Sequence, residues 1–420
     1  MRRPKLLDTM RDYSWPLLRA DALAGVSVAL VALPLCIAIA IASGSTPFVG
    51  LVTAILGGFV ISATSGSRVQ IGGPTGAFIV VVYGVIQDHG MDGLIIATIM
   101  AGLILIVAGF FRAGRLIALV PEAVIDGFTI GIAAIIAASQ LQDALGLSAG
   151  KVPAEMVPKL EALWAARGTL GLAALAVTTA TVAAILLLRR WRPRWPVLVI
   201  AVGAASLAVL LFHLPVDTVG SRFGALPSGL PAPHWPEVTP DRLVRLLPSA
   251  LTIAFLAGVE SLLSAIVADR MFGGHHRPSA ELLAQGYANV LTPLFGGLPV
   301  TGAIARTATN VRAGGRTPVA GMVHALVILI VLLAAGGLAG ALALPALAAV
   351  LLVTAWNMAE PEKWRDHLAL SWDERLLLLV TLLLTIFADL TVAIGVGVAL
   401  GLVLQRWKGR GALPWTPRDN

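Results

Sequence analysis

Two short motifs in this sequence combine glycine, proline and threonine in a pattern that favours anion binding. Residues 72–77 read GGPTGA, residues 296–306 read GGLPVTGAIAR, and the tripeptide TGA thus occurs at 75 and again at 301. Proline suits the first turn of a helix and lacks the amide that would be left unpaired there. Each motif predicts a helix start with free amides, where small residues leave room for an anion. The predicted ligands are Pro74, Thr75, Gly76, Ala77, Thr301, Gly302 and Ala303.

A cation and a carboxylate accompany the two motifs. Arg306 would lie about one turn into the second helix, where its charge would attract an anion. Glu260 is an isolated acidic residue in an apolar stretch, and Ser264 lies one turn further on the same helical face. A carboxylate beside a hydroxyl can carry a proton or supply two oxygens to a sodium ion. The sequence therefore predicts a cation-coupling site at Glu260 and Ser264, next to the anion site.

The elements that position these residues are predicted to be membrane helices. Hydrophobic residues make up 57% of the sequence and charged residues only 13%. Uncharged runs such as Ala22–Ser67 and Gly93–Phe111 can cross a bilayer, which needs about 20 residues per helix. The first apolar run is too long for a cleavable signal peptide, and the single cysteine, Cys36, excludes an internal disulfide. These features predict an all-α integral membrane protein.

Hydrophobic patterning predicts about fourteen membrane segments, several of them short or broken by glycine and proline. Their centres are expected near Leu33, Leu56, Val80, Leu103, Ile132, Ala180, Val202, Phe255, Tyr287, Ala305, Val327, Val350, Val380 and Ile394.

The distribution of basic residues predicts the orientation of these segments. With both termini in the cytoplasm, most of the 30 Lys and Arg residues fall in inner loops, as the positive-inside rule requires. The net charge of +7 then reflects membrane topology and contact with anionic lipid, and it needs no nucleic-acid partner. We expect a multi-pass protein of the cell membrane, or inner membrane, with a homodimer as a possible assembly.

The repeated TGA tripeptide predicts an internal repeat of seven plus seven segments. Because seven is odd, the two halves must be inverted relative to each other, as in many secondary transporters. The two short helices would then meet at the bilayer midplane with their positive ends facing each other. Small residues could instead merely allow close helix packing, and Arg306 could extend to an interface. We favour binding, because non-helical backbone at membrane depth is tolerated only where it is buried or lines a cavity.

The membrane potential makes cation coupling an expected part of the function. Moving an anion into an inside-negative cell costs about 2.3 kcal/mol per charge per 100 mV. Glu260 is a natural proton carrier at this depth, whereas a sodium site needs several oxygens, of which the sequence supplies only Glu260 and Ser264. We therefore expect H⁺ rather than Na⁺ as the coupling ion, with no other cofactor. The alternative is a structural carboxylate paired with Arg306 or with a helix end.

The sequence resembles the sulfate permease (SulP) family of anion transporters over nearly its whole length. The resemblance rests on ESLLSAIVADRMFGG (260–274) and on the run ELLAQGYANVLTPLFGGLPVTGAIARTATNVRAGGRTPVAGMVHA (281–325), with GGPTGAF, VIDGFTIGIA and TVGSRFGALPSGLPAPHWP as further landmarks. It implies a moving core domain made of residues 1–120 and 241–340. Residues 121–240 and 341–420 would form a gate domain and a short cytosolic tail. The core would carry the anion as an elevator.

The resemblance also implies that the anion sits between the third and tenth segments, at the motif residues and Arg306, flanked by Glu260 and Ser264 on the eighth segment. Two features depart from the family pattern. Pro34 is followed by Leu35, where family members commonly have a polar residue. The sequence ends at Asn420 without the STAS domain that most members carry, through natural absence or truncation.

The leading hypothesis is a secondary active transporter of small anions such as sulfate or bicarbonate, probed best by uptake into proteoliposomes. A dicarboxylate or nucleobase permease on the same fold is the alternative within transport, and an anion channel is the alternative of another class. An enzyme is the least favoured class, because no catalytic dyad or metal-ligand cluster occurs in the predicted membrane segments.

Overall fold

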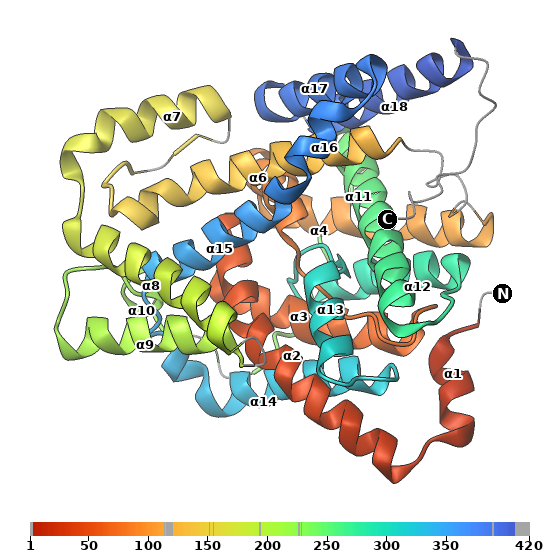
Figure 1. The fold of residues 1–420 in the computed structure, drawn as a ribbon, viewed down its shortest axis with the longest axis horizontal. Coiled ribbons are helices and arrows are strands. Elements are labelled where there is room, and N and C mark those ends of the chain that lie inside the picture. The colour runs from red at the N-terminus through yellow and green to blue at the C-terminus, as the bar shows by residue number, and fades with distance from the viewer. Residues whose placement is uncertain are drawn as a thin grey trace.

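The computed structural model describes residues 3–112, 114, 121–150, 152–153, 155–192, 195–225, 227, 229–388 and 390–407. Helices dominate these residues, as predicted (Figure 1). The α-helices are α1 (Lys5–Thr9), α2 (Trp15–Ala42), α3 (Pro47–Thr64), α4 (Ile79–Phe110), α6 (Glu122–Leu145), α7 (Met156–Ala165), α8 (Leu172–Trp191), α9 (Val197–Leu211), α10 (Val219–Phe223), α11 (Pro240–Phe272), α12 (Pro278–Leu294), α13 (Ile304–Arg312), α14 (Val319–Ala339), α15 (Leu344–Met358), α16 (Trp364–Ala369), α17 (Trp372–Phe387) and α18 (Leu390–Trp407). Short 3₁₀ turns lie at η1 (Met10–Asp12), η2 (Gly76–Phe78), η3 (Ala166–Thr169) and η4 (Pro361–Lys363).

Seven helical stretches among the described residues are long and apolar enough to cross a membrane. They are Trp15–Ala42, Pro47–Thr64, Gly76–Phe110, Glu122–Leu145, Leu172–Trp191, Pro240–Phe272 and Leu344–Ala369. These stretches make the chain a multi-pass membrane protein.

Each of the fourteen predicted segment centres lies in a helix, but not always in a helix of its own. Val80 and Leu103 share α4, which is interrupted at Gly90 by a backbone φ of 70°. Ala305 lies in α13, which has nine residues and is too short to cross a bilayer alone. Fourteen crossings in an inverted repeat therefore remain a prediction.

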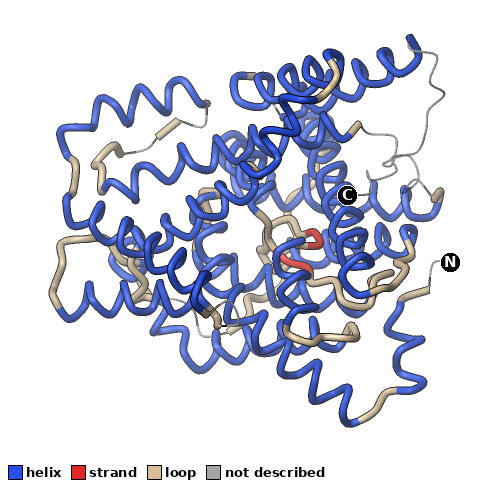
Figure 2. The backbone as a smooth tube through the Cα atoms, in the orientation of Figure 1, coloured by secondary structure: helices blue, strands red, loops and turns tan. Residues whose placement is uncertain are grey.

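Two short strands lie among the helices at the centre of the molecule, where Figure 2 draws them in red. Strand β1 (Gly72–Gly73) pairs antiparallel with β2 (Thr301–Gly302), Gly72 opposite Gly302 and Gly73 opposite Thr301. Glycine suits β1, because Gly73 has a φ of 153° and a Cβ there would overlap the Arg306 guanidinium. The sequence analysis predicted the break in each half of the chain and missed the pairing that joins them.

Buried side chains satisfy the non-helical backbone that leads into β2. The Asn289 side chain accepts a hydrogen bond from Val300 N at 2.9 Å and donates one to Val300 O at 2.8 Å, as a neighbouring strand would. Thr53 Oγ1 accepts a hydrogen bond from Leu298 N at 2.8 Å. An extended segment can lie at this depth because its amides and carbonyls have partners.

Helix packing divides most of the molecule into two groups (Figure 1). In the first helix group, α2, α3, α4, α11, α12, α13 and α14 pack on one another. In the second helix group, α6, α8, α9, α15, α17 and α18 do so, and the groups touch mainly where α2 meets α9 and α15, α4 meets α6, and α11 meets α18. The predicted core domain (1–120 with 241–340) and gate domain (121–240 with 341–420) remain predictions about which part moves.

A buried carboxylate joins the two halves of the first helix group. Asp21 of α2 is 0% exposed and accepts hydrogen bonds from Arg316 N at 2.8 Å and Thr317 N at 3.1 Å, just before α14. It also accepts from the Thr317 hydroxyl at 2.5 Å and the Tyr13 hydroxyl at 3.1 Å. Burial, with the Asp21 charge, raises the pKa of Tyr13 to about 12, so this phenol stays a donor.

Candidate functional site

The strand pair brings two helix starts together, one from each half of the chain. Gly76 begins η2 three residues after β1, and η2 leads directly into α4. Ile304 begins α13 two residues after β2. The preceding residues are extended, Thr75 with φ −125° and ψ 158° and Ala303 with φ −100° and ψ 112°. Neither start is capped by a side-chain hydrogen bond, so its first amides keep free N–H groups and a partial positive charge.

Glu260 lies next to the first of these helix starts. The Thr75 hydroxyl donates a hydrogen bond to Glu260 Oε2 at 2.9 Å, joining α11 to the turn that precedes α4. Both side chains are half-buried. Among the described residues, Glu260 forms no ion pair with Arg306, so of the two structural alternatives only a carboxylate paired with a helix end fits this geometry.

Arg306 extends from α13 across to the other motif. The side chain is only 1% exposed, and its Nη2 donates a hydrogen bond to Pro74 O at 2.7 Å. Its Nε and Nη1 have no hydrogen-bond partner, and Nη1 lies against Gly73. The guanidinium is thus buried beside the strand pair rather than extended to an interface, and it keeps N–H groups that can donate to an anion.

Ser264 and Thr301 use their hydroxyls inside the protein. Ser264 Oγ lies 3.1 Å from Thr307 Oγ1, which accepts a hydrogen bond from Ile71 N at 3.1 Å. The Thr301 hydroxyl donates to Ala257 O at 2.8 Å and is fully buried. Both hydroxyls fasten the strand pair to α11 and α13, and neither contacts Glu260.

Among the remaining motif residues, Gly76 lies where the two helix groups meet. Gly76 faces the second group, since a Cβ built there would lie 3.2 Å from Ile136 of α6 and 3.2 Å from Met358 of α15. Ala77 beside it is 2% exposed and Ala303 across the strand pair is 9% exposed. All ten predicted residues thus lie around one strand pair.

A family model and a close relative decide what kind of protein carries this site. The model described as the sulfate permease family matches residues 18–381. The Bacillus subtilis protein YvdB is 40% identical over 396 residues, which cover 94% of this chain and 74% of YvdB. The chain belongs to the sulfate permease family. Its relatives in this family are transporters and not enzymes.

Solved structures of two anion transporters share the fold. The transmembrane domain of the cyanobacterial bicarbonate transporter BicA superposes with a TM-score of 0.82 at 30% identity, covering 91% of this chain and 99% of that one. The murine anion transporter Slc26a9 superposes with a TM-score of 0.87 over 96% of this chain and 71% of its own, at 18% identity. The second likeness bears on the fold alone.

A buried polar stripe on α12 supports the site in this family member, and the sequence analysis assigned it no role. Glu281, Gln285 and Asn289 follow one another at intervals of four residues, and each is 0% exposed. Glu281 Oε1 accepts from Ser261 Oγ at 2.8 Å and Gln285 Nε2 at 2.9 Å, and its Oε2 accepts from Ser65 Oγ at 2.6 Å. Gly66 N is the fourth donor, at 3.1 Å from Oε2. Both oxygens of the Glu281 side chain thus have hydrogen-bond donors, which come from α11, from α12 and from the turn after α3.

Besides the two hydrogen bonds of Asn289 to Val300, Gln70 connects this network with β2. Gln70 Nε2 donates to Ser261 Oγ at 2.9 Å, and the Gln70 amide fills the space where a Cβ on Gly302 would lie. Glutamate, glutamine and asparagine at i, i+4 and i+8 on a predicted helix could have revealed the stripe, because that spacing puts them on one face. Together, the geometry offers free amides, a buried guanidinium and one neighbouring carboxylate.

Proposed function

We propose that this protein is a secondary active transporter of small oxyanions, with sulfate or bicarbonate as substrate. The family carries sulfate in its name, and BicA, whose transmembrane domain superposes on this chain, is a bicarbonate transporter. One observation supports the proposal most: two uncapped helix starts and the unpaired N–H groups of Arg306 gather around one strand pair. Backbone amides and a guanidinium are donors that suit an oxyanion.

Glu260 is the proposed coupling residue, and a proton is the proposed coupling ion. Its Oε2 accepts one hydrogen bond, from Thr75, whose backbone leads directly into the amides at Gly76. Protonation of Glu260 would remove a negative charge beside the anion site, so proton binding and anion binding would favour each other. A sodium site at the same place is disfavoured by Ser264, whose hydroxyl bonds to Thr307 rather than facing Glu260.

Transport would proceed by sliding of the first helix group, the proposed core, against the second, the proposed gate. The small residues at Gly76 and Ala77 meet the gate helices α6 and α15, and such a boundary can slide without large side chains interlocking. An inverted repeat of fourteen segments, cytoplasmic termini and a homodimer complete the proposal. Residues 408–420, at the proposed cytoplasmic C-terminus, lie outside the described residues.

Reconstituted uptake tests the proposal directly. Purified protein in proteoliposomes is supplied with radiolabelled sulfate, bicarbonate, fumarate or uracil, while proton and sodium gradients are imposed separately. Uphill accumulation of sulfate or bicarbonate driven by the proton gradient is the expected result. Uptake of fumarate or uracil alone would establish the other substrate class, and currents without accumulation would establish a channel.

A further inference from the structure

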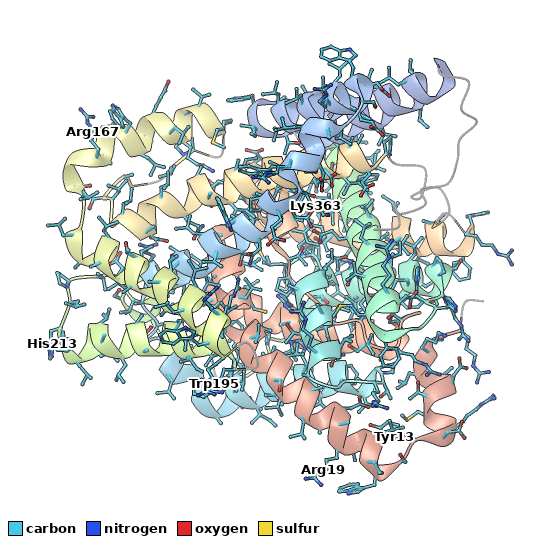
Figure 3. All side chains as sticks on the ribbon, in the orientation of Figure 1. Tyr13, Arg19, Arg167, Trp195, His213 and Lys363 are labelled. Carbon is cyan, nitrogen blue, oxygen red and sulfur yellow. The ribbon has the colours of Figure 1, made fainter. Side chains whose placement is uncertain are left out.

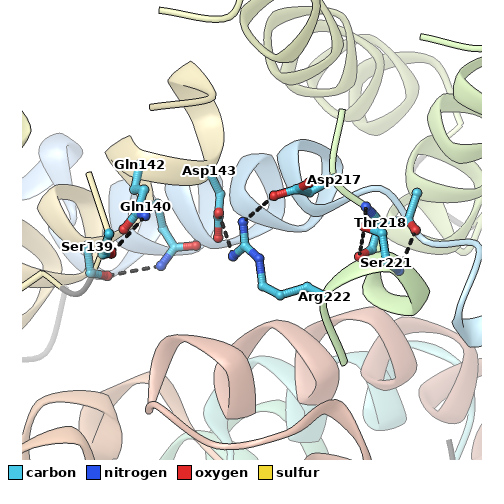
Figure 4. Close-up of polar contacts among 9 residues, drawn as sticks. Ser139, Gln140, Gln142, Asp143, Asp217, Thr218, Ser221 and Arg222 are labelled. Atoms are coloured by element: carbon cyan, nitrogen blue, oxygen red, sulfur yellow. Dashed lines mark hydrogen bonds and ion pairs between the residues drawn. The ribbon is translucent and has the colours of Figure 1, made fainter. Parts of the chain in front are cut away.

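A cavity with both polar and apolar residues in its walls lies between α2, α4, α6, α7 and α10, and none of the strand-pair residues lines it. Its volume is about 420 Å³, within the range of small-molecule sites. Tyr83 and Gln87 of α4 line one wall, Ser139 and Gln140 of α6 line another, and Lys159 of α7 closes it. Figure 4 shows the α6 and α10 side of this region.

Lys159 occupies a position on α7 where an apolar residue is expected. The buried residues of this helix are Met156, Lys159 and Leu163, spaced three and four apart, so they form its inward face. Large apolar residues lie on the other face, where Leu160 is 45% exposed and Trp164 is 70% exposed. Lys159 itself is only 6% exposed. A lysine on the inward face carries a desolvation cost that packing alone does not explain.

The Lys159 side chain lies against an aromatic ring and forms no ion pair with the described residues. It lies 5.7 Å from the centre of the Tyr83 ring, and the Tyr83 hydroxyl donates to Val152 O at 2.7 Å, which fixes that ring. In the described part of the chain, Lys159 has no carboxylate within salt-bridge distance; Glu155, one turn earlier, is exposed. Burial lowers the pKa of Lys159, and Glu155 opposes that shift.

The other cation of the cavity is already paired. Arg222 of α10 forms ion pairs with Asp143 at 2.8 Å and Asp217 at 2.9 Å, both drawn in Figure 4. These carboxylates raise the pKa of Arg222 and neutralise its charge. Among the described residues that line this cavity, Lys159 is therefore the cation that remains available to a ligand.

The cavity ends close to the proposed transport site. Ile79 of α4 lines the cavity one turn after Gly76, and it is 2% exposed. Ile136 of α6 is fully buried, next to the cavity residue Ile135, and lies against Gly76. Ile79 and Ile136 are thus the apolar residues that lie nearest to both the cavity and the first helix start, and we refer to them as the isoleucine layer.

We propose that this cavity is a second oxyanion-binding site, with Lys159 as its charged ligand, in which substrate waits before it passes the isoleucine layer. The proposal rests on the proposed transport function for the identity of the anion. The Lys159 ammonium supplies charge, and the Gln140 amide, which bonds to Ser139 Oγ at 3.0 Å through Nε2, supplies a neutral donor. Residues of both helix groups line the cavity, so the affinity of the cavity for an anion would also depend on the relative position of the two groups.

Sided uptake of radiolabelled sulfate tests this role of Lys159. Lys159→Gln should raise the half-saturating sulfate concentration about fivefold from the α7 side, the effect of losing roughly 1 kcal/mol of binding. The half-saturating concentration from the opposite side should stay unchanged, as right-side-out and inside-out vesicles can show. Arg167→Gln is the matched control, because Arg167 is an exposed cation stacked on Trp164 at the end of the same region (Figure 3).

Equal half-saturating concentrations for Lys159→Gln and wild type from the α7 side would overturn the proposal, and so would an equal increase in Arg167→Gln. Wild-type protein that transports none of the tested anions would contradict the proposed function instead, and the following measurement would then decide the cavity by itself.

Chemical modification of the wild-type protein needs no variant. Cyanate carbamylates lysines, and mass spectrometry follows the rate at each site. Sulfate should slow carbamylation of Lys159 relative to gluconate at equal ionic strength, because a bound anion protects the amine, while Lys363 at its Glu360 ion pair should react equally in both. Equal protection at both lysines, or none at Lys159, would refute binding in the cavity.

Discussion

Glu260 is the residue on which the proposed coupling depends. Glu260→Gln imitates the protonated carboxyl and can keep a hydrogen bond to the Thr75 hydroxyl, so the local geometry should survive. We expect this variant to lose accumulation driven by a proton gradient while it still exchanges anion for anion. Counterflow and gradient-driven uptake in the same proteoliposomes separate the two activities.

Ser264→Ala is the matched control for Glu260→Gln. It removes a hydroxyl one turn away that bonds to Thr307, and coupling should persist. Uphill uptake by Glu260→Gln under either cation gradient would show that coupling resides elsewhere.

Arg306 is expected to contribute affinity through the N–H groups it leaves unpaired. Arg306→Ala removes a buried charge next to the strand pair and leaves Pro74 O without its donor. We expect the half-saturating anion concentration to rise at least tenfold, since a charge-assisted hydrogen bond is worth about 1.5–3 kcal/mol. Uptake kinetics measure this, and an unchanged half-saturating concentration in correctly folded protein would remove Arg306 from the binding site.

Gly302 is predicted to tolerate no side chain. A Cβ at this position would overlap the Gln70 amide and push against the network that reaches Glu281. Gly302→Val should therefore abolish uptake. Gly84→Val is its control, because no atom lies within 4 Å of a Cβ built at Gly84 of α4. Normal uptake by Gly302→Val would show that the pocket is elsewhere.

The short elements around the strand pair were only partly predictable from sequence. Gly-Gly-Pro in one half of the sequence and Gly-Gly-Leu-Pro in the other predicted two helix breaks, because glycine and proline disfavour a continuous helix. Their antiparallel register was not predictable, since it depends on how Asn289 and Thr53 hold the segment before β2. Arg306 was recognised by its charge, but its contact with Pro74 follows from tertiary packing alone.

The role of Lys159 on α7 and the contacts of Asp21 with the residues before α14 were also not predictable from the sequence. Neither an amphipathic helix of ten residues nor a lysine on its inward face stands out in a sequence scanned for membrane segments. Asp21 precedes a long apolar run and looks like an interfacial residue, yet it holds the start of α14 almost three hundred residues later. Long-range contacts of this kind depend on the assembled helices.

Asp21 should matter for stability more than any surface carboxylate. Asp21→Ala leaves the buried amide of Thr317 and the partly buried amide of Arg316 without an acceptor, and we expect a loss of about 2–4 kcal/mol in unfolding free energy. Thermal unfolding in detergent would show a lower midpoint. Asp241→Ala is the comparison, because its side chain is 69% exposed and pairs only with Arg245, so its midpoint should hardly move. Equal unfolding midpoints for the two variants would contradict a stabilising role of the hydrogen bonds between Asp21 and the residues before α14.

The proposed orientation of the protein in the membrane can be tested by labelling single introduced cysteines, and only one native cysteine must first be removed. Figure 3 places Arg167 and His213 at one end of the molecule and Tyr13 and Arg19 towards another. Cys36 is buried and can be replaced by alanine. In that background, a membrane-impermeant maleimide should label Arg167→Cys from outside intact cells and label Arg19→Cys only after the membrane is opened. Labelling of Arg19→Cys in intact cells would reverse the proposed topology.

The strand pair also constrains how the chain is made. Gly72 and Gly73 enter the membrane more than two hundred residues before Thr301 and Gly302 are synthesised, so β1 waits for its partner during translation. Exposed amides in lipid are costly, and the early segments must therefore stay near water, the insertion machinery or each other until β2 arrives. Two fragments divided between the halves, produced together in one cell, should each be unstable alone and should complement each other by closing this pair.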